Sequence, residues 1–172
     1  SANLADDKNL DGHLLPGLEP IGVPRDLKGL VLPFRYNCFA EIEALVRDHK
    51  IGAIKMEVSR NEGPKDHFLQ KVREIATQNN IVLIFDECTS GFRETFGGLH
   101  KKYGVEPDIA VFGKALGNGY PITAVIGRDE VMEVAQDTFI SSTFWTERIG
   151  NVAGLKTLEI MEKERSWESI TR

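Results

Sequence analysis

Two residues in the middle of the chain combine types and positions that could do chemistry. Asp86 directly follows an apolar run over residues 81–85, and Lys114 follows Gly113 after a second run over residues 109–112. Desolvation among apolar residues and glycines lowers the pKa of a lysine, which makes its amine nucleophilic and suited to forming a Schiff base. A carboxylate at a strand end can hold a cationic group of a ligand, because burying it without a cation is costly.

Each residue taken alone also has an ordinary explanation. Most lysines are solvated surface charges, and Asp86 or Glu87 could cap the next segment or pair with Arg93. An apolar strand that ends in Asp-Glu is also typical of P-loop ATPases, which require a glycine-rich loop ending in Gly-Lys-Ser/Thr. Here Ala115 follows Gly113-Lys114 and Asp108 stands where that loop needs a glycine, so the ATPase interpretation is excluded.

Taken together, the aspartate and the lysine predict a pyridoxal-phosphate site. The lysine would hold the cofactor aldehyde as an imine, and the carboxylate would keep the ring nitrogen protonated so that the ring acts as an electron sink. Such a site needs both groups at one edge of the fold.

The surrounding pattern alternates strands with helices. We expect strands over residues 51–58, 81–85, 108–112 and 122–126, and helices over 39–46, from Pro64 to the Asn79-Asn80 pair, over 129–137 and over 147–167. The run over 81–85 is predicted to be buried on both faces. Inward positions of the last helix are expected to be Ile149, Val152, Ala153, Ile160 and Met161. The alternation predicts an α/β fold with a mostly parallel sheet covered by helices, and ligands bind beyond the carboxyl ends of such strands.

Two segments differ in composition. Residues 1–37 hold four of the seven prolines and show no sustained apolar period, whereas residues 38–172 follow the regular pattern. We therefore expect an irregular segment over 1–37 and a cofactor-binding α/β core over 38–172.

Three motifs resemble those of class III pyridoxal-phosphate aminotransferases, and most closely those of glutamate-1-semialdehyde aminomutases. They read DECTSGFR at residues 86–93, PDI at 107–109 and GKALGNGYP at 113–121. The resemblance runs from about residue 51 to residue 158, and the spacing from Asp86 to Lys114 matches. It implies part of the large domain of fold-type I transferases, pyridoxal 5'-phosphate as cofactor, and transfer or internal migration of an amino group between small molecules.

The resemblance also assigns roles residue by residue. Lys114 would form the imine and move a proton between substrate and cofactor carbons, and Asp86 would pair with the pyridinium nitrogen. Cys88 would pack against one ring face, where a small apolar thiol fits, and Thr89 would lie near the ring hydroxyl. The pair Ser142-Thr143 would bind the cofactor phosphate across a homodimer interface, or would simply cap the helix from Glu147.

Members of this family carry a phosphate-binding loop upstream of these motifs and a smaller domain downstream. The chain therefore reads as the central part of the large domain, and we expect weak cofactor retention and little turnover from these residues alone. The alternative is a non-catalytic fragment or interaction module that keeps only the core of the fold. Arg93 is expected to anchor its loop by pairing with a nearby acid.

Composition excludes several other classes of protein. The 172 residues are 41% hydrophobic and 27% charged with a net charge of −5, and without a dense basic stretch nucleic-acid binding is not expected. Apolar runs are too short for a membrane span. Two cysteines build no disulfide framework, which favours a cytoplasmic location. The four histidines are scattered without ligand spacing, so no metal site is expected.

Overall fold

A computed structural model describes residues 22, 24–27, 29–59 and 61–171. The chain divides into two compact units, residues 1–50 and residues 51–172, and each is described by itself. Most of the predicted irregular segment lies outside the described residues, and its described part contains one short 3-10 helix, η3 (Arg25–Leu27). The predicted boundary at residue 38 stays a prediction.

The first unit contains one α-helix, α1 (Phe39–Asp48), among its described residues, at the position that the apolar period predicts. Ile42 is buried. Before the helix, the backbone N–H of Arg35 donates to the Glu41 carboxylate at 2.7 Å, and the Arg35 guanidinium pairs with the same carboxylate. These bonds tie the approaching chain to the first turn of α1.

The second unit is built on a four-stranded sheet with the strand order β1-β2-β3-β4. The strands are β1 (Ala53–Glu57), β2 (Val82–Asp86), β3 (Ile109–Phe112) and β4 (Ala124–Gly127). The first three run parallel, whereas β4 pairs antiparallel with β3. The mostly parallel sheet confirms the expected fold class, and all four predicted strands are present.

One face of the sheet carries the core of this unit. The buried side chains alternate along the strands, as the two-residue period requires: Ile54, Met56, Leu83, Phe85, Ala110 and Phe112. Helix α2 (Phe68–Gln78) packs against β2 and buries Phe68, Leu69, Val72 and Ala76. On the other face, Ile84 is only half-buried, so the expectation that β2 is buried on both faces is wrong.

Helix α2 starts four residues later than Pro64 would suggest. Asp66 and His67 adopt left-handed backbone angles, with φ of 50° and 57°, which a right-handed helix cannot include. The helix therefore begins at Phe68 and ends at Gln78, directly before the predicted Asn79-Asn80 stop.

After β2, the chain forms a turn and a short helix, α3 (His100–Tyr103), that the sequence pattern did not predict. The predicted helix over 129–137 consists of α4 (Asp129–Met132) and the 3-10 helix η5 (Glu133–Asp137). The last predicted helix divides into α5 (Ile149–Glu164) and α6 (Ser166–Ile170), because Arg165 takes a left-handed φ of 49° between them.

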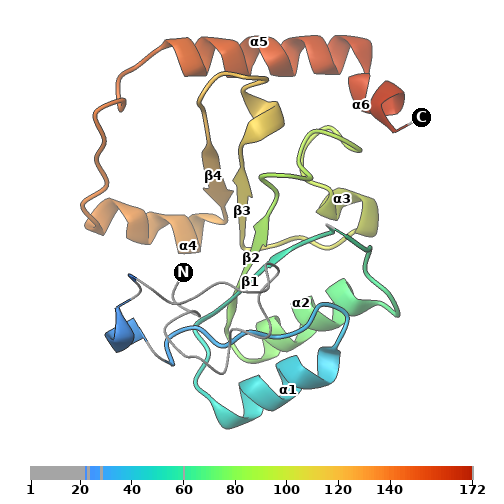
Figure 1. Cartoon of the computed structure of the whole chain (residues 1–172), viewed down its shortest axis with the longest axis vertical. Helices are drawn as coiled ribbons and strands as arrows, with labels where there is room; N and C mark the ends of the chain where they lie inside the picture. Colours follow the sequence, from blue (N-terminus) through green and yellow to red (C-terminus); the bar gives the residue numbers. More distant parts are fainter. Residues whose placement is uncertain (1–21, 23, 28, 60, 172) are drawn as a thin grey trace. The chain divides into compact units, whose positions relative to one another are not determined.

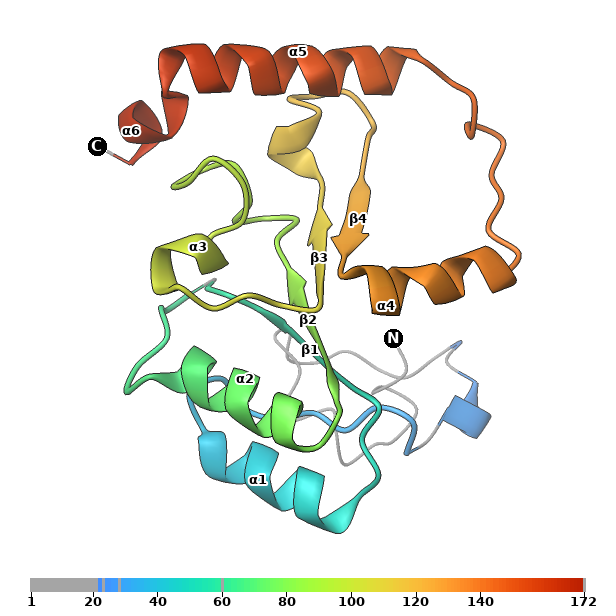
Figure 2. The same cartoon turned by 180° about the vertical axis from the view of Figure 1, so that it is seen from behind.

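Helix α5 lies across the end of the sheet at which β3 ends (Figures 1 and 2) and packs on the 3-10 helix η4 (Lys114–Leu116). Its buried positions are Gly150 and Gly154, and a Cβ atom on Gly154 would lie 3.3 Å from Ile122 Cδ1. The expected inward face is wrong for Ile149, Val152 and Ile160, which are exposed. The two glycines make the close contact instead, because only they allow the helix backbone to approach residues 116–122.

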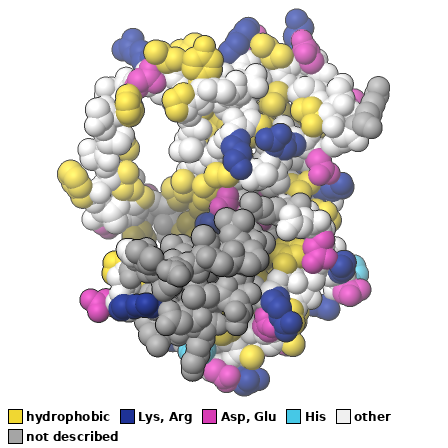
Figure 3. All heavy atoms as spheres, viewed as in Figure 1, with side chains coloured by type: hydrophobic (Ala, Val, Ile, Leu, Met, Phe, Trp, Pro, Cys, Tyr) yellow, Lys and Arg dark blue, Asp and Glu magenta, His cyan; other side chains and the backbone are white. Residues whose placement is uncertain are grey.

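Apolar side chains therefore remain on the surface of this end of the second unit. Figure 3 shows them along α5 and along the loop that precedes it. The largest exposed fractions in that loop are those of Phe139, Phe144 and Trp145, at 98%, 76% and 66%. None of the described helices is long and apolar enough to cross a membrane.

Candidate active site

Asp86 is the last residue of β2, and its side chain is held on two sides. The Lys55 ammonium on β1 lies 2.6 Å from Asp86 Oδ2, and the backbone N–H of Cys88 donates to Oδ1 at 3.2 Å. Partial burial alone would raise the pKa of Asp86, but the bonds from Lys55 and Cys88 outweigh it, so the pKa lies below the ordinary value. Asp86 is therefore a carboxylate that stays ionised at neutral pH.

Lys114 lies at the same edge of the sheet, two residues past the end of β3. Its ammonium Nζ donates to the Thr89 hydroxyl at 2.7 Å. The lysine also adopts a left-handed φ of 46°, an uncommon angle for a residue with a side chain. Across the described part of the chain no carboxylate pairs with this ammonium, so its partner is the neutral oxygen of Thr89.

The strand register explains why these residues meet. Asp86 on β2 is paired with Val111 on β3, so both strands end at one edge and the residues that follow them are neighbours. After β2, the backbone N–H of Gly91 donates to the carbonyl oxygen of Glu87 at 2.8 Å, which closes a tight turn that carries Cys88 and Thr89. Asp86 and Lys114 therefore belong to segments at the same edge of the sheet, and their joint role stays a prediction.

Cys88 also faces this edge. A Cβ atom on Gly113 would lie 3.5 Å from the Cys88 sulfur, so the thiol and the backbone before Lys114 are in close approach. Burial raises the pKa of Cys88, and the negative charge of Asp86 adds to this effect. The thiol is consequently protonated at neutral pH and acts as a small apolar side chain.

Glu87, the next residue after Asp86, is fully buried and belongs to a network that the sequence did not predict. Its carboxylate accepts hydrogen bonds from the Ser90 hydroxyl and from the backbone N–H of His100 at 3.0 Å, and His100 Nδ1 lies 2.9 Å from it. Burial alone would raise the pKa of Glu87, but these hydrogen bonds lower it by more, so the pKa lies below the ordinary value. The network fixes the turn that carries Cys88 and Thr89.

Arg93 anchors this turn differently from the expectation. Its Nε donates to the carbonyl oxygen of Thr89 at 2.6 Å. Within residues 22, 24–27, 29–59 and 61–171 no acid pairs with Arg93, so the predicted ion pair is wrong there. Among the described residues no backbone N–H donates to the Thr89 carbonyl, and the Arg93 guanidinium is its hydrogen-bond donor instead.

Comparison with known proteins identifies the family. The family model of class-III aminotransferases matches residues 32–172. The chain belongs to the class-III aminotransferases. It is 41% identical over 153 residues to the 3-aminobutyryl-CoA aminotransferase of Cloacimonas acidaminovorans, which covers 84% of the chain and 37% of that protein.

Two further likenesses agree with this assignment. The glutamate-1-semialdehyde 2,1-aminomutase of Citrifermentans bemidjiense is 36% identical over 158 residues, covering 87% of the chain and 37% of the aminomutase. The FumI protein of Sphingopyxis sp. MTA144, solved in its PLP internal aldimine form, superposes with a TM-score of 0.76 at 26% identity, covering 82% of the chain and 36% of that protein.

These findings confirm the fold of PLP-dependent fold-type I aminotransferases and indicate pyridoxal phosphate as the cofactor. The chain spans 37% of the length of these two curated relatives.

The site residues fit that cofactor by their chemistry. An aldehyde needs an amine that is not neutralised by a carboxylate, and Lys114 contacts a hydroxyl instead. A pyridinium N–H needs an ionised carboxylate with a free lone pair to accept it. Lys55 and the Cys88 N–H each engage one lone pair of Asp86, on different oxygens, so a lone pair remains on each oxygen.

Ser142 and Thr143 lie elsewhere in this class-III aminotransferase chain. They belong to the exposed loop between η5 and α5, which runs outside β4 in Figures 1 and 2. Among the described residues no hydrogen bond joins either of them to Lys114 or Asp86. Neither hydroxyl caps α5, because the Glu147 carboxylate accepts the bonds from the backbone N–H groups of Ile149 and Gly150. These bonds lower the pKa of Glu147.

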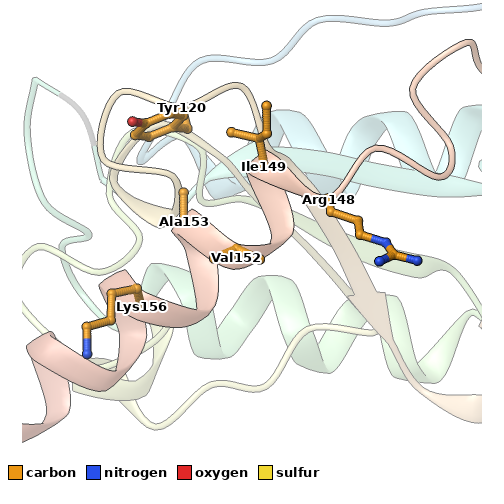
Figure 4. Close-up of a pocket in the computed structure, with 6 residues that line it drawn as sticks. All are labelled: Tyr120, Arg148, Ile149, Val152, Ala153 and Lys156. Carbon is orange, nitrogen blue, oxygen red and sulfur yellow. The ribbon is translucent and has the colours of Figure 1, made fainter.

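A cavity of about 400 Å³ lies beside α5, and Tyr120 of the 113–121 motif is one of its lining residues. Figure 4 shows Tyr120 and Ile149 on one side of it, with Arg148 and Lys156 pointing outward in opposite directions. Neither Lys114 nor Asp86 lines it. The cavity therefore does not include the two residues predicted to bind the cofactor.

Lys55 is the residue of this edge that the sequence analysis missed. Its signal was a charge in the middle of the otherwise apolar stretch Ile54–Met56, two residues before Glu57. Such a charge must point to solvent or to a partner, but only the strand order shows that β2, and hence Asp86, is the neighbour.

Proposed function

We propose that this chain is the lysine-bearing part of a pyridoxal-phosphate-dependent aminotransferase or aminomutase. The observation that supports it is the position of Lys114 and Asp86 at the ends of neighbouring parallel strands, with the Lys114 ammonium on the neutral Thr89 hydroxyl.

The residues divide the chemistry among them. Pyridoxal phosphate, when bound, supplies an aldehyde that Lys114 can hold as a Schiff base and a ring that withdraws electrons. The Lys114 amine would hold that aldehyde and, when free, could move a proton as a base. Asp86 holds the proton on the ring nitrogen, Thr89 positions the Lys114 amine, and Cys88 packs on a ring face.

Ser142 and Thr143 would bind the cofactor phosphate of a second copy of the chain in a homodimer. The large exposed fractions of Phe139, Phe144 and Trp145, which flank this pair, support a partner at this loop. The proposed assembly is a cytoplasmic homodimer with small-molecule amino donors and acceptors as substrates. Transfer between two molecules and migration within one amino-aldehyde both use the same lysine chemistry.

The lysine assignment is tested by trapping. The protein is incubated with pyridoxal phosphate and reduced with borohydride, which fixes the cofactor on the lysine that holds it, and peptide mass spectrometry then locates that lysine. We expect the label and the imine absorption band at Lys114, and loss of both in Lys114→Ala. The control is Lys156→Ala, because Lys156 is an exposed lysine that pairs with Glu159.

Label spread evenly over surface lysines, with an unchanged band in Lys114→Ala, would contradict the proposal. Trapping detects weak binding, so it remains informative if these residues alone retain the cofactor poorly. A protein that binds cofactor at Lys114 but turns over no amino compound would favour the alternative, a module that keeps only the core of the fold. An isotope-labelled amino group then separates transfer to an acceptor from internal migration.

A further inference from the structure

Lys55 occupies an unusual place for a lysine in this sheet. It lies in the middle of β1, paired in register with Ile84 on β2, so it shares the face of the sheet that carries Asp86 two residues further along β2. Its Nζ reaches Asp86 Oδ2 at 2.6 Å. A charge within a parallel strand is unfavourable unless it has such a partner.

The charges around Asp86 make Lys55 more than a chance neighbour. Glu57, on β1, is the residue paired directly with Asp86, and like charges on adjacent strands disfavour each other. On β3 the paired residue is the uncharged Val111. In the turn after β2, Cys88 donates its backbone N–H to Asp86, and its protonated, uncharged thiol also interacts with that carboxylate. The ammonium of Lys114 is engaged with Thr89. Among the residues that the structure describes, Lys55 is therefore the cation that contacts Asp86 directly.

The contact leaves room for one more donor. Each carboxylate oxygen has two lone pairs. The Lys55 ammonium uses one on Oδ2 and the Cys88 N–H uses one on Oδ1, while a quarter of the Asp86 side chain remains exposed. A ring N–H could be added without displacing either donor.

We propose that Lys55 is a positioning residue that orients Asp86 and shares it with the ring nitrogen of the bound cofactor. The inference rests on the proposed function, since it takes Asp86 as the partner of that nitrogen. The Lys55 ammonium keeps Asp86 ionised and also offsets part of the negative charge of its carboxylate. The carboxylate of a Lys55-paired aspartate therefore holds the ring proton less tightly than an isolated carboxylate would, which moderates the electron-withdrawing strength of the ring.

The first measurement uses the protein without cofactor. The carboxyl carbon of Asp86 is followed by NMR over pH in wild type, Lys55→Gln and Lys55→Arg, with Asp86→Asn to assign the signal. We expect the midpoint to rise by about one pH unit in Lys55→Gln, because an adjacent cation lowers a carboxyl pKa by about 1–3 units and Lys55 is partly exposed. Lys55→Arg keeps the charge and should restore most of the shift.

A matched control is Lys102→Gln, since Lys102 forms a similar ion pair with Glu94 at 2.8 Å but away from Asp86. It should leave the Asp86 midpoint unchanged. An Asp86 midpoint that is the same in wild type and Lys55→Gln overturns the proposal.

The second measurement uses the loaded protein with ¹⁵N-labelled pyridoxal phosphate and follows protonation of the ring nitrogen over pH. We expect this titration to move to higher pH in Lys55→Gln and to return in Lys55→Arg. If Lys55→Gln shifts the titration midpoint of Asp86 but not that of the ring nitrogen, Lys55 only holds Asp86 in place. That result overturns the proposal that Asp86 is shared between Lys55 and the ring nitrogen. If the wild type gives no cofactor signal at Lys114, the proposed function fails and the sharing fails with it, whereas the Asp86 titration still reports the Lys55 contact.

Discussion

Two aspartates lie at opposite ends of the parallel strands and differ in how completely their oxygens are used. Asp108, before β3, is almost fully buried and accepts bonds from the Leu83 backbone N–H at 2.7 Å, from Arg73 at 2.9 Å and from Arg128 at 3.2 Å. Asp86, after β2, keeps a quarter of its side chain exposed and has one lysine and one backbone partner.

The difference separates a structural carboxylate from one that can bind a ligand. Both carboxylates have a lowered pKa, so the pKa direction alone does not tell them apart. Asp108 joins α2, β2, β3 and the end of β4 through its three donors and has little room for another. Within the described residues, the hydrogen-bond partners of Asp86 come from β1 and from its own turn, at the strand ends where parallel sheets bind ligands. Unused lone pairs at that edge are the distinguishing property.

The largest effect on stability is expected for Asp108→Asn. The isosteric amide removes the charge that Arg73 and Arg128 face, and its single oxygen cannot serve three donors. Breaking a buried pair on one side is strongly destabilising, and because Arg128 is half-exposed we expect a loss of about 3 kcal/mol in the free energy of unfolding. Urea unfolding followed by circular dichroism measures this. A loss below about 1 kcal/mol would mean that Asp108 is no more structural than Asp86.

The acid dependence of stability should follow the same carboxylate. Desolvation raises the pKa of Asp108, but the bonds from Leu83, Arg73 and Arg128 lower it more, so the folded value lies below the unfolded one. Its contribution is therefore present above the unfolded pKa, about 4, and disappears as pH falls through the folded pKa. The gap in unfolding free energy between wild type and Asp108→Asn should narrow below about pH 4. A gap that stays constant down to pH 2 would contradict this assignment.

Apolar runs, together with the residues that separate them, were sufficient to predict much of the second unit. The β-branched and aromatic runs gave the four strands, and the Gly-Lys pair after the third run placed Lys114 beside the end of β2. The face of α5 was not predictable in this way. Apolar residues suggest burial, but close packing on residues 116–122 requires glycine at 150 and 154. The spacing of apolar residues along the helix does not reveal that requirement.

The partners of the site carboxylates depend on contacts between distant residues. Lys55 meets Asp86 only because β1 and β2 are neighbours in a given register, and a single sequence taken alone does not contain strand order. Glu87 and His100 meet because the intervening turn folds back, with Gly98 closely packed against both. Local residue types led to the prediction that Asp86 and Lys114 do the chemistry, which stays a prediction, whereas these supporting contacts required the structure.

A substitution at Glu87 tests whether burial or position along the sheet makes a carboxylate important for stability, because Glu87 is adjacent to Asp86 in sequence and as buried as Asp108. Its carboxylate serves the Ser90 hydroxyl and the His100 backbone N–H, with His100 Nδ1 beside it. In Glu87→Gln the charge is lost and one oxygen becomes an amide nitrogen that can only donate, so the charge-assisted bonds from Ser90 and His100 are replaced by weaker neutral ones. We expect a loss of about 2 kcal/mol in urea unfolding, with Glu94→Gln, at an exposed surface pair, as the matched control. Equal effects of the two variants would show that burial of Glu87 does not matter.

The smallest effect on stability is expected for Asp86→Asn, although its effect on the cofactor should be large. An ion pair with a partly exposed lysine contributes at most about 1 kcal/mol, so the free energy of unfolding should change by less than that. The neutral amide cannot hold the ring proton, so the ring nitrogen signal of bound ¹⁵N-labelled pyridoxal phosphate should become that of the unprotonated ring near neutral pH. Asp108→Asn, measured where it is still folded, should leave that signal unchanged. A large loss of stability together with an unchanged ring signal would make Asp86 a second structural carboxylate, and the contrast between the two ends of the sheet would disappear.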